Sequence, residues 1–96
     1  MLVAAAPAEA SRLVDVSLGP LLALPEVERG RLLRTLGHWF TSGGVTASAA
    51  ERLFVHPNTV RYRLRRIEEL TGRSLSDPIA LCDLGAGLYA LRLLPF

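Results

Sequence analysis

The residues best suited to chemistry lie between positions 56 and 67, and their side chains are those of a recognition surface. At about 100° per residue, a helix through this segment places its apolar residues in one narrow sector: Val60, Leu64 and Ile67. The opposite side then carries amide, phenol and guanidinium groups, from Asn58, Arg61, Tyr62 and Arg65. A helix that docks on a core and exposes such groups suits the major groove of double-stranded DNA, which admits one α-helix.

Position within this segment predicts a role for each polar side chain. Asn58 can make two hydrogen bonds to adenine, and Arg61 or Arg65 can do the same with guanine, each good pair giving about 1–3 kcal/mol of discrimination. Tyr62 can contact a thymine methyl group or a phosphate. The other polar side chains are expected to contact phosphates, which fix register without reading sequence: Thr46, His56, Thr59, Arg63, Arg66 and Arg73. For His56, helix capping or packing in the turn is the favoured alternative.

The charge of the chain is modest overall but concentrated near this helix. The formal net charge is +2 over 96 residues, and all eleven basic residues are arginine. Five of them fall between positions 61 and 73, which gives the local basic stripe expected of a phosphate binder. The two histidines and Cys82 have no recognised metal-ligand spacing, and no carboxylate pair suits acid–base catalysis. We therefore expect a protein that is not an enzyme and needs no metal or cofactor.

Five helices are expected to position this surface, and no strand alternation is present, so the predicted fold class is an all-α bundle. The predicted helices cover residues 8–18, 25–41, 47–54, 57–71 and 78–94. Gly19-Pro20 is expected to stop the first helix, and residues 21–24 to form a connection. Thr46 is expected to cap the third helix, and Gly72 to end the fourth. Prolines suit the first turn of three of these helices, at Pro25, Pro57 and Pro78.

The third and fourth predicted helices are joined by too few residues to lie antiparallel, so they should cross steeply. This arrangement is a helix-turn-helix, in which the second helix enters the DNA groove. Ala50 supplies the small side chain needed where the two helices approach. Phe54 stands in the turn where many such motifs have glycine, which predicts a variant turn.

These residues together resemble the C-terminal DNA-binding domain of PucR/CdaR-type bacterial transcription regulators. The resemblance rests on the run His56-Pro57-Asn58-Thr59-Val60-x-Tyr62-Arg63-Leu64, followed by Ile67-Glu68-x-Leu70-Thr71-Gly72-Arg73, and covers roughly residues 17–94. It implies a sequence-specific output domain over residues 17–96, a tail or linker with a short helix over residues 1–16, and sensory domains that lie outside this chain. The segment Leu84-Gly85-Ala86-Gly87-Leu88 is more apolar and glycine-rich than is usual in that family.

The predicted fifth helix is apolar nearly all round, so it must be covered on more than one side. Either the first helix covers it or a second subunit does. Because groove-reading motifs often act as two-fold pairs, we expect a homodimer through residues 78–94.

Two other functions remain open for a chain of this composition. The main alternative is a helical protein-interaction or dimerisation module whose basic helix meets an acidic partner. RNA binding is disfavoured because no aromatic stacking platform is visible. The single cysteine and the lack of about 18 consecutive uncharged apolar residues predict a cytoplasmic protein without a membrane partner.

Overall fold

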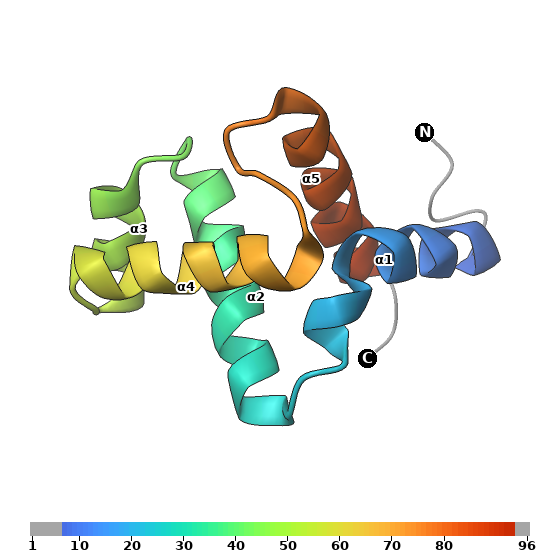
Figure 1. Cartoon of the computed structure of the whole chain (residues 1–96), viewed down its shortest axis with the longest axis horizontal. Coiled ribbons are helices and arrows are strands. Elements are labelled where there is room, and N and C mark those ends of the chain that lie inside the picture. Colours follow the sequence, from blue (N-terminus) through green and yellow to red (C-terminus); the bar gives the residue numbers. More distant parts are fainter. Residues whose placement is uncertain (1–6, 94–96) are drawn as a thin grey trace.

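Five α-helices make up the fold, which a computed structural model describes for residues 7–93 (Figure 1). They are α1 (Pro7–Leu22), α2 (Glu26–Thr41), α3 (Thr46–Leu53), α4 (Pro57–Thr71) and α5 (Pro78–Leu93). No strand occurs between residues 7 and 93, which confirms the predicted all-α bundle. Leu94, the predicted last residue of the fifth helix, lies outside the described residues.

The helix α4 is central to the bundle, where it contacts α1, α2 and α3 (Figure 1). Its apolar stripe is buried as predicted, since Val60 and Ile67 are fully buried and Leu64 nearly so. All five helices contribute to one core: Val14, Leu18, Leu21, Leu32, Leu36, Ala49, Ala50, Val60, Leu64, Ile67, Leu84 and Ala90. The recognition surface predicted for α4 is therefore carried by a helix that is anchored on one side.

The prediction that Gly19-Pro20 ends the first helix is wrong, because α1 continues to Leu22. Pro20 stands near the carboxyl end of α1, so its missing N–H removes one hydrogen bond from the last turns. Leu18 and Leu21 on either side of it are both fully buried. Burying a leucine side chain contributes about 1.5–3 kcal/mol, which offsets the loss. The second half of α1 bends away from the first half (Figure 1), as expected at an internal proline.

The helix α1 packs across α5 (Figure 1), so it covers one side of the apolar fifth helix. The two helices meet at Gly87, where an added Cβ would lie 2.1 Å from the Ser17 hydroxyl oxygen. Ser17 is itself buried, and its hydroxyl donates to the Leu13 carbonyl at 2.7 Å. One side of α5 is thus covered within the chain, and a second subunit is not needed for that side.

The helices α3 and α4 are joined by three residues, and the turn has a geometry that glycine would favour. Phe54 ends α3 in the left-handed region, with φ 57° and ψ 42°. Its side chain is 94% exposed. The departure noted in the sequence is therefore a left-handed phenylalanine in place of the usual glycine.

We expect the substitution Phe54→Gly to stabilise the fold by about 1 kcal/mol, because the left-handed conformation costs a residue with a Cβ about 1–2 kcal/mol. Denaturation in urea measures the change in the free energy of unfolding. Phe54→Ala is the matched control, since it removes the ring but keeps the Cβ. An equal gain from both variants would attribute the effect to the exposed ring and contradict backbone strain.

The predicted cap at the start of the third helix is also wrong. Val45 occupies the N-cap position, and Thr46 is the first residue of α3. No side chain caps the amide groups of this first turn. Backbone hydrogen bonds tighten the preceding turn instead, with Gly44 N donating to the Trp39 carbonyl at 2.9 Å.

Candidate nucleic-acid interface

The start of α4 is fixed by a histidine cap and a proline. His56 is the N-cap residue, and its Nδ1 accepts a hydrogen bond from the Asn58 amide at 3.0 Å. Pro57 follows at the first helical position, where its missing N–H costs nothing. The capping alternative for His56 is confirmed, and its Nδ1 is an acceptor in this arrangement. Gly72 ends the helix with φ 68°, as predicted.

The outward face of α4 presents the four side chains that the sequence assigns to base reading. Asn58, Arg61, Tyr62 and Arg65 are all exposed. The Arg61 guanidinium donates to Asn58 Oδ1 at 2.6 Å, so two of these groups hold one another in place. The amide nitrogen of Asn58 is left to donate to another group, and Tyr62 is 62% exposed.

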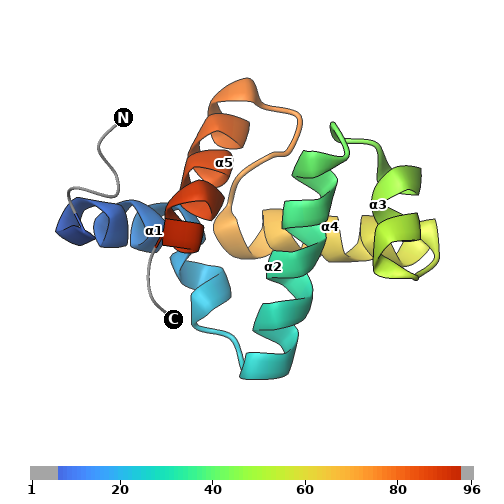
Figure 2. The same ribbon diagram turned by 180° about the vertical axis from the view of Figure 1, so that it is seen from behind.

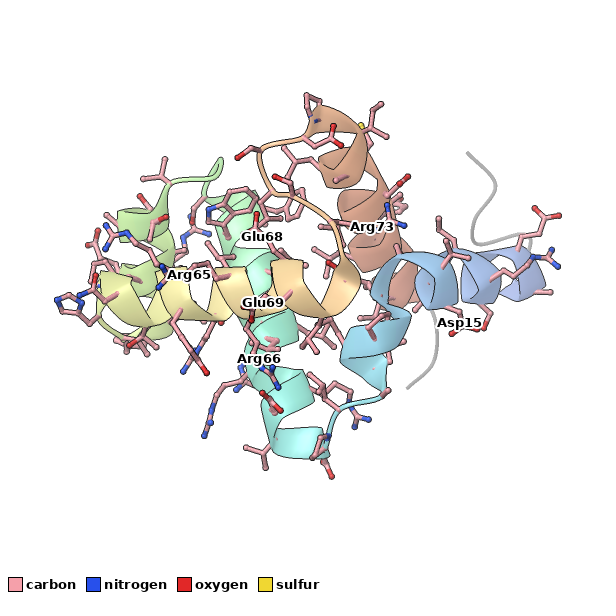
Figure 3. All side chains as sticks on the ribbon, in the orientation of Figure 1. Asp15, Arg65, Arg66, Glu68, Glu69 and Arg73 are labelled. Atoms are coloured by element: carbon pink, nitrogen blue, oxygen red, sulfur yellow. The ribbon has the colours of Figure 1, made fainter. Side chains whose placement is uncertain are left out.

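The other arginines of this region turn toward the body of the protein. Arg63 donates to the Thr35 hydroxyl at 3.3 Å, and Arg66 Nε lies 3.2 Å from a carboxylate oxygen of Glu28. Both partners belong to α2. Arg73 lies 2.6 Å from a carboxylate oxygen of Asp83 on α5. Figure 3 shows Arg66 over α2 and Arg73 beside α5, whereas Arg65 lies on α4 toward α3. The predicted arginines therefore form two groups. Arg61 and Arg65 are exposed on α4, whereas Arg63, Arg66 and Arg73 contact α2 or α5.

Arg63 is in the least favourable electrostatic position of these arginines. Burial lowers the pKa of Arg63, and the charges of Arg31 and Arg34 lower it further. Arg63 therefore lies near the like charges of Arg31 and Arg34 on α2, and no salt bridge forms to these three guanidinium groups within residues 7–93. The cluster makes this side of the molecule attractive to anions.

A hollow beside α4 brings distant polar residues together. Thr46 at the start of α3 lines it with Arg61 and Arg65 of α4, and Ser76 lines it from the loop before α5. Thr59, another predicted phosphate contact, is half-buried on α4 and does not line this hollow. Ser76 was missed by sequence reasoning, because the loop between α4 and α5 has no periodic pattern that would place it.

Glu68 lies at the rim of the same hollow and has a structural partner. Its carboxylate accepts from the Leu75 amide at 2.8 Å, which ties the loop before α5 to α4. The loop, and with it Ser76, is thereby held near α4.

Other kinds of site find no support among the described residues. Between residues 7 and 93, no three His, Cys, Asp or Glu side chains gather as a metal site would require. In the same range, none of the helices has the length and apolar character to cross a lipid bilayer.

Comparison with known proteins identifies the motif. The family model of the PucR C-terminal helix-turn-helix domain matches residues 32–90, which is more than half of the chain. The purine catabolism regulatory protein of Bacillus subtilis is 41% identical over 73 residues, or 76% of this chain. The proline-responsive transcriptional activator PutR of the same species is 37% identical over 75 residues, or 78% of this chain. The carbohydrate diacid regulator of Escherichia coli is 42% identical over 59 residues, or 60% of this chain.

The chain is much shorter than these relatives. It spans 14%, 18% and 15% of their lengths, respectively. An uncharacterized protein of Mycobacterium tuberculosis is 51% identical over 47 residues, which is 49% of this chain and 11% of that protein. No solved structure is significantly similar to the chain. The helix-turn-helix geometry and the matched residues together confirm the resemblance seen in the sequence, and the chain belongs to the family of PucR C-terminal helix-turn-helix domains.

Proposed function

We propose that this chain is the sequence-specific DNA-binding output domain of a bacterial transcription regulator, acting in the cytoplasm. In this proposal the amino-terminal half of α4 enters the major groove. The observation that carries it is the division of α4 into a fully buried apolar stripe and an exposed stripe of Asn58, Arg61, Tyr62 and Arg65. Membership in a family of regulator domains supports the same function.

The amino-terminal half of α4 is the part suited to base reading. Asn58 and Arg61 are hydrogen-bonded to each other, which lowers the entropy lost when both are ordered on DNA. Arg65 lies one turn further on the same side. Glu69 is exposed beyond it, and its negative charge would be repelled by phosphates. The groove contact therefore ends near Arg65.

Phosphate contacts in this proposal come from the start of α3, the cap of α4 and the flanking arginines. Thr46 lies with Arg61 and Arg65 at one hollow, which suits a backbone phosphate. His56 and Thr59 lie at the end of α4 that enters the groove. Arg63, Arg66 and Arg73 have partners within the protein, so binding phosphate requires each to share or exchange its partner.

Of the two ion-paired arginines, Arg66 releases its partner in the protein at the lower cost in free energy. Its side chain is 36% exposed and that of Glu28 is 39% exposed, and exposed ion pairs of this kind contribute only about 0–1 kcal/mol. A phosphate near Arg66 can therefore compete with Glu28 for the guanidinium. Arg73 is held more firmly, because its ion pair with Asp83 is 2.6 Å long and its side chain is only 23% exposed.

We expect Arg66→Ala to make the negative slope of log affinity against log salt shallower by about 0.9, because one phosphate contact and its released counterion are lost. Titration of the domain with duplex DNA at several salt concentrations measures the slope. Arg12→Ala is the control, since Arg12 is exposed on α1, at the far end of the molecule from α3 (Figure 1). An unchanged slope for Arg66→Ala would leave the arginine as a structural partner of Glu28 alone.

The experiment that tests the whole proposal is selection from random duplex DNA with the purified protein. A reproducible enriched sequence, bound more tightly than its scrambled form, is the expected result. Binding without sequence preference would contradict base reading by α4. No binding at low salt would favour the alternative, a helical protein-interaction module.

We also propose that the domain pairs through α5. The side of α5 away from α1 exposes Ile79, Cys82 and Tyr89, which share one face of the helix. We expect sedimentation to show a dimer that Ile79→Glu converts to a monomer, because a charge in an apolar interface is costly to desolvate. A monomer of the unchanged protein at high concentration would contradict pairing.

A further inference from the structure

A groove runs between α2 and α5 on the face of the molecule away from α4. Figure 2 looks onto this face, with α2 and α5 in front and α4 behind them. The two helices make almost no close backbone contact, and three adjoining hollows lie along them. The hollows share residues and so form one strip, whose apolar lining includes Leu22, Leu33, Gly37, Leu88 and Leu91.

The geometry of α2 separates this groove from the proposed DNA interface. Thr35 is fully buried and contacts Arg63 of α4. Leu33 and Gly37 stand two residues to either side of it, so about 200° of rotation directs them to the opposite side of α2. A molecule in the groove therefore leaves the outer face of α4 free.

The groove combines an apolar floor with a cationic rim. Its charged or basic lining residues are Arg29, Arg34, His38 and Arg52. Among residues 7–93, no acidic side chain lines any of the three hollows. Gly37 leaves space on the floor, since nothing outside its own helix lies within 4 Å of an added Cβ.

We infer that this groove binds an amphipathic α-helix of a partner protein, with aspartate or glutamate flanking its apolar stripe. The lined part of α2 extends from Arg29 to Thr41, which at 1.5 Å per residue is about 18 Å, or roughly three turns of a docked helix. Apolar side chains spaced i, i+3 or i+4, and i+7 reach a floor of that length. Carboxylates beside them face the arginines, which fixes the orientation of the helix and speeds its association.

Charge favours such a partner over a second copy of this chain. The exposed face of α5, with Ile79, Cys82 and Tyr89, is apolar, and the carboxylate of Asp83 beside it is already paired with Arg73. A copy seated by that face would leave Arg34 and Arg52 near apolar surface without a counter-charge. An acidic helix supplies both the apolar stripe and the counter-charge, and the domain remains able to hold DNA at the same time.

Selection from a displayed library of 14-residue helical peptides tests the inference on the whole chain. Leucines are fixed at i, i+3 and i+7, and the neighbouring positions vary among Glu, Lys, Gln and Ala. We expect the enriched peptides to carry glutamate beside the leucines. Enrichment without a preference for glutamate over lysine would overturn the inference.

Two glycine variants then locate the peptide by fluorescence anisotropy. Gly37→Leu fills the groove floor and is expected to weaken the best peptide about ten-fold or more, equivalent to about 1.4 kcal/mol. Gly19→Leu is the matched control, because Gly19 is also helical, has nothing within 4 Å of an added Cβ and lies outside the groove. Equal peptide affinity in both variants would overturn the inference.

Two further measurements test whether charge selects the peptide and whether peptide binding is independent of DNA binding. Arg34→Glu is expected to weaken the acidic peptide and to strengthen its lysine counterpart. Affinity for the selected duplex is expected to be the same for Gly37→Leu and the unchanged protein, with peptide bound or absent. Peptide binding that competes with DNA, or a groove filled by a second copy and released only by dilution, would overturn the inference while leaving the DNA-binding proposal intact.

Discussion

The substitution Arg65→Ala will weaken binding to the selected duplex by about 5- to 150-fold and relax the base preference at one position of that duplex. This range corresponds to the 1–3 kcal/mol of discrimination that a good bidentate contact with guanine provides. Arg65 is exposed on α4, and within residues 7–93 no hydrogen bond or ion pair holds its guanidinium. Its whole donor set is therefore available to a base. Competition between duplexes that differ at single base pairs measures both effects.

Lysine at the same position separates base reading from charge. Arg65→Lys keeps the positive charge but loses the planar guanidinium fork, so we expect it to recover affinity for scrambled DNA more fully than it recovers the base preference. Weakening by the same factor on every duplex would instead place Arg65 on a phosphate. No loss with alanine would remove Arg65 from the interface.

The helix that carries the interface could be predicted from the sequence because its signals are local. Pro57 and Gly72 delimit α4 as predicted, and the buried residues follow the helical period. Neighbours in the sequence determine both features. The same is true of the start of α5, where Asp77 Oδ1 accepts from the Ile79 amide at 3.0 Å.

Features that depend on distant residues could not be predicted in this way. Three arginines found partners 28, 38 and 10 residues away in sequence, namely Thr35 for Arg63, Glu28 for Arg66 and Asp83 for Arg73. A charge run alone does not show which of its members face solvent. The carboxyl end of α1 was missed for a similar reason, because burial of Leu21 in the tertiary core outweighs a local helix breaker.

Among the glycines, Gly87 leaves the least space for a Cβ, because α1 crosses α5 there. We therefore expect the largest loss of stability from a substitution at this position. We expect Gly87→Ala to lower the free energy of unfolding by about 1–3 kcal/mol, the usual cost of overpacking a core. The new Cβ would lie 2.1 Å from Ser17 Oγ and 3.2 Å from Leu18 Cγ. Neither atom is the end of a long flexible side chain, and both belong to fully buried residues. Urea denaturation of both proteins measures the difference.

Gly37→Ala is the matched control, because it is an equally helical glycine with open space around the added Cβ. Alanine should stabilise that position by up to about 1 kcal/mol through helix propensity alone. A second substitution, Ser17→Ala, identifies the cause of the loss at Gly87. It removes the hydroxyl that blocks the new Cβ, so the double variant should be more stable than the sum of the single changes implies, by an interaction energy of about 0.5–3 kcal/mol. Strict additivity would show that α1 and α5 separate in response to the methyl group, and that the contact with Ser17 is not what limits their approach.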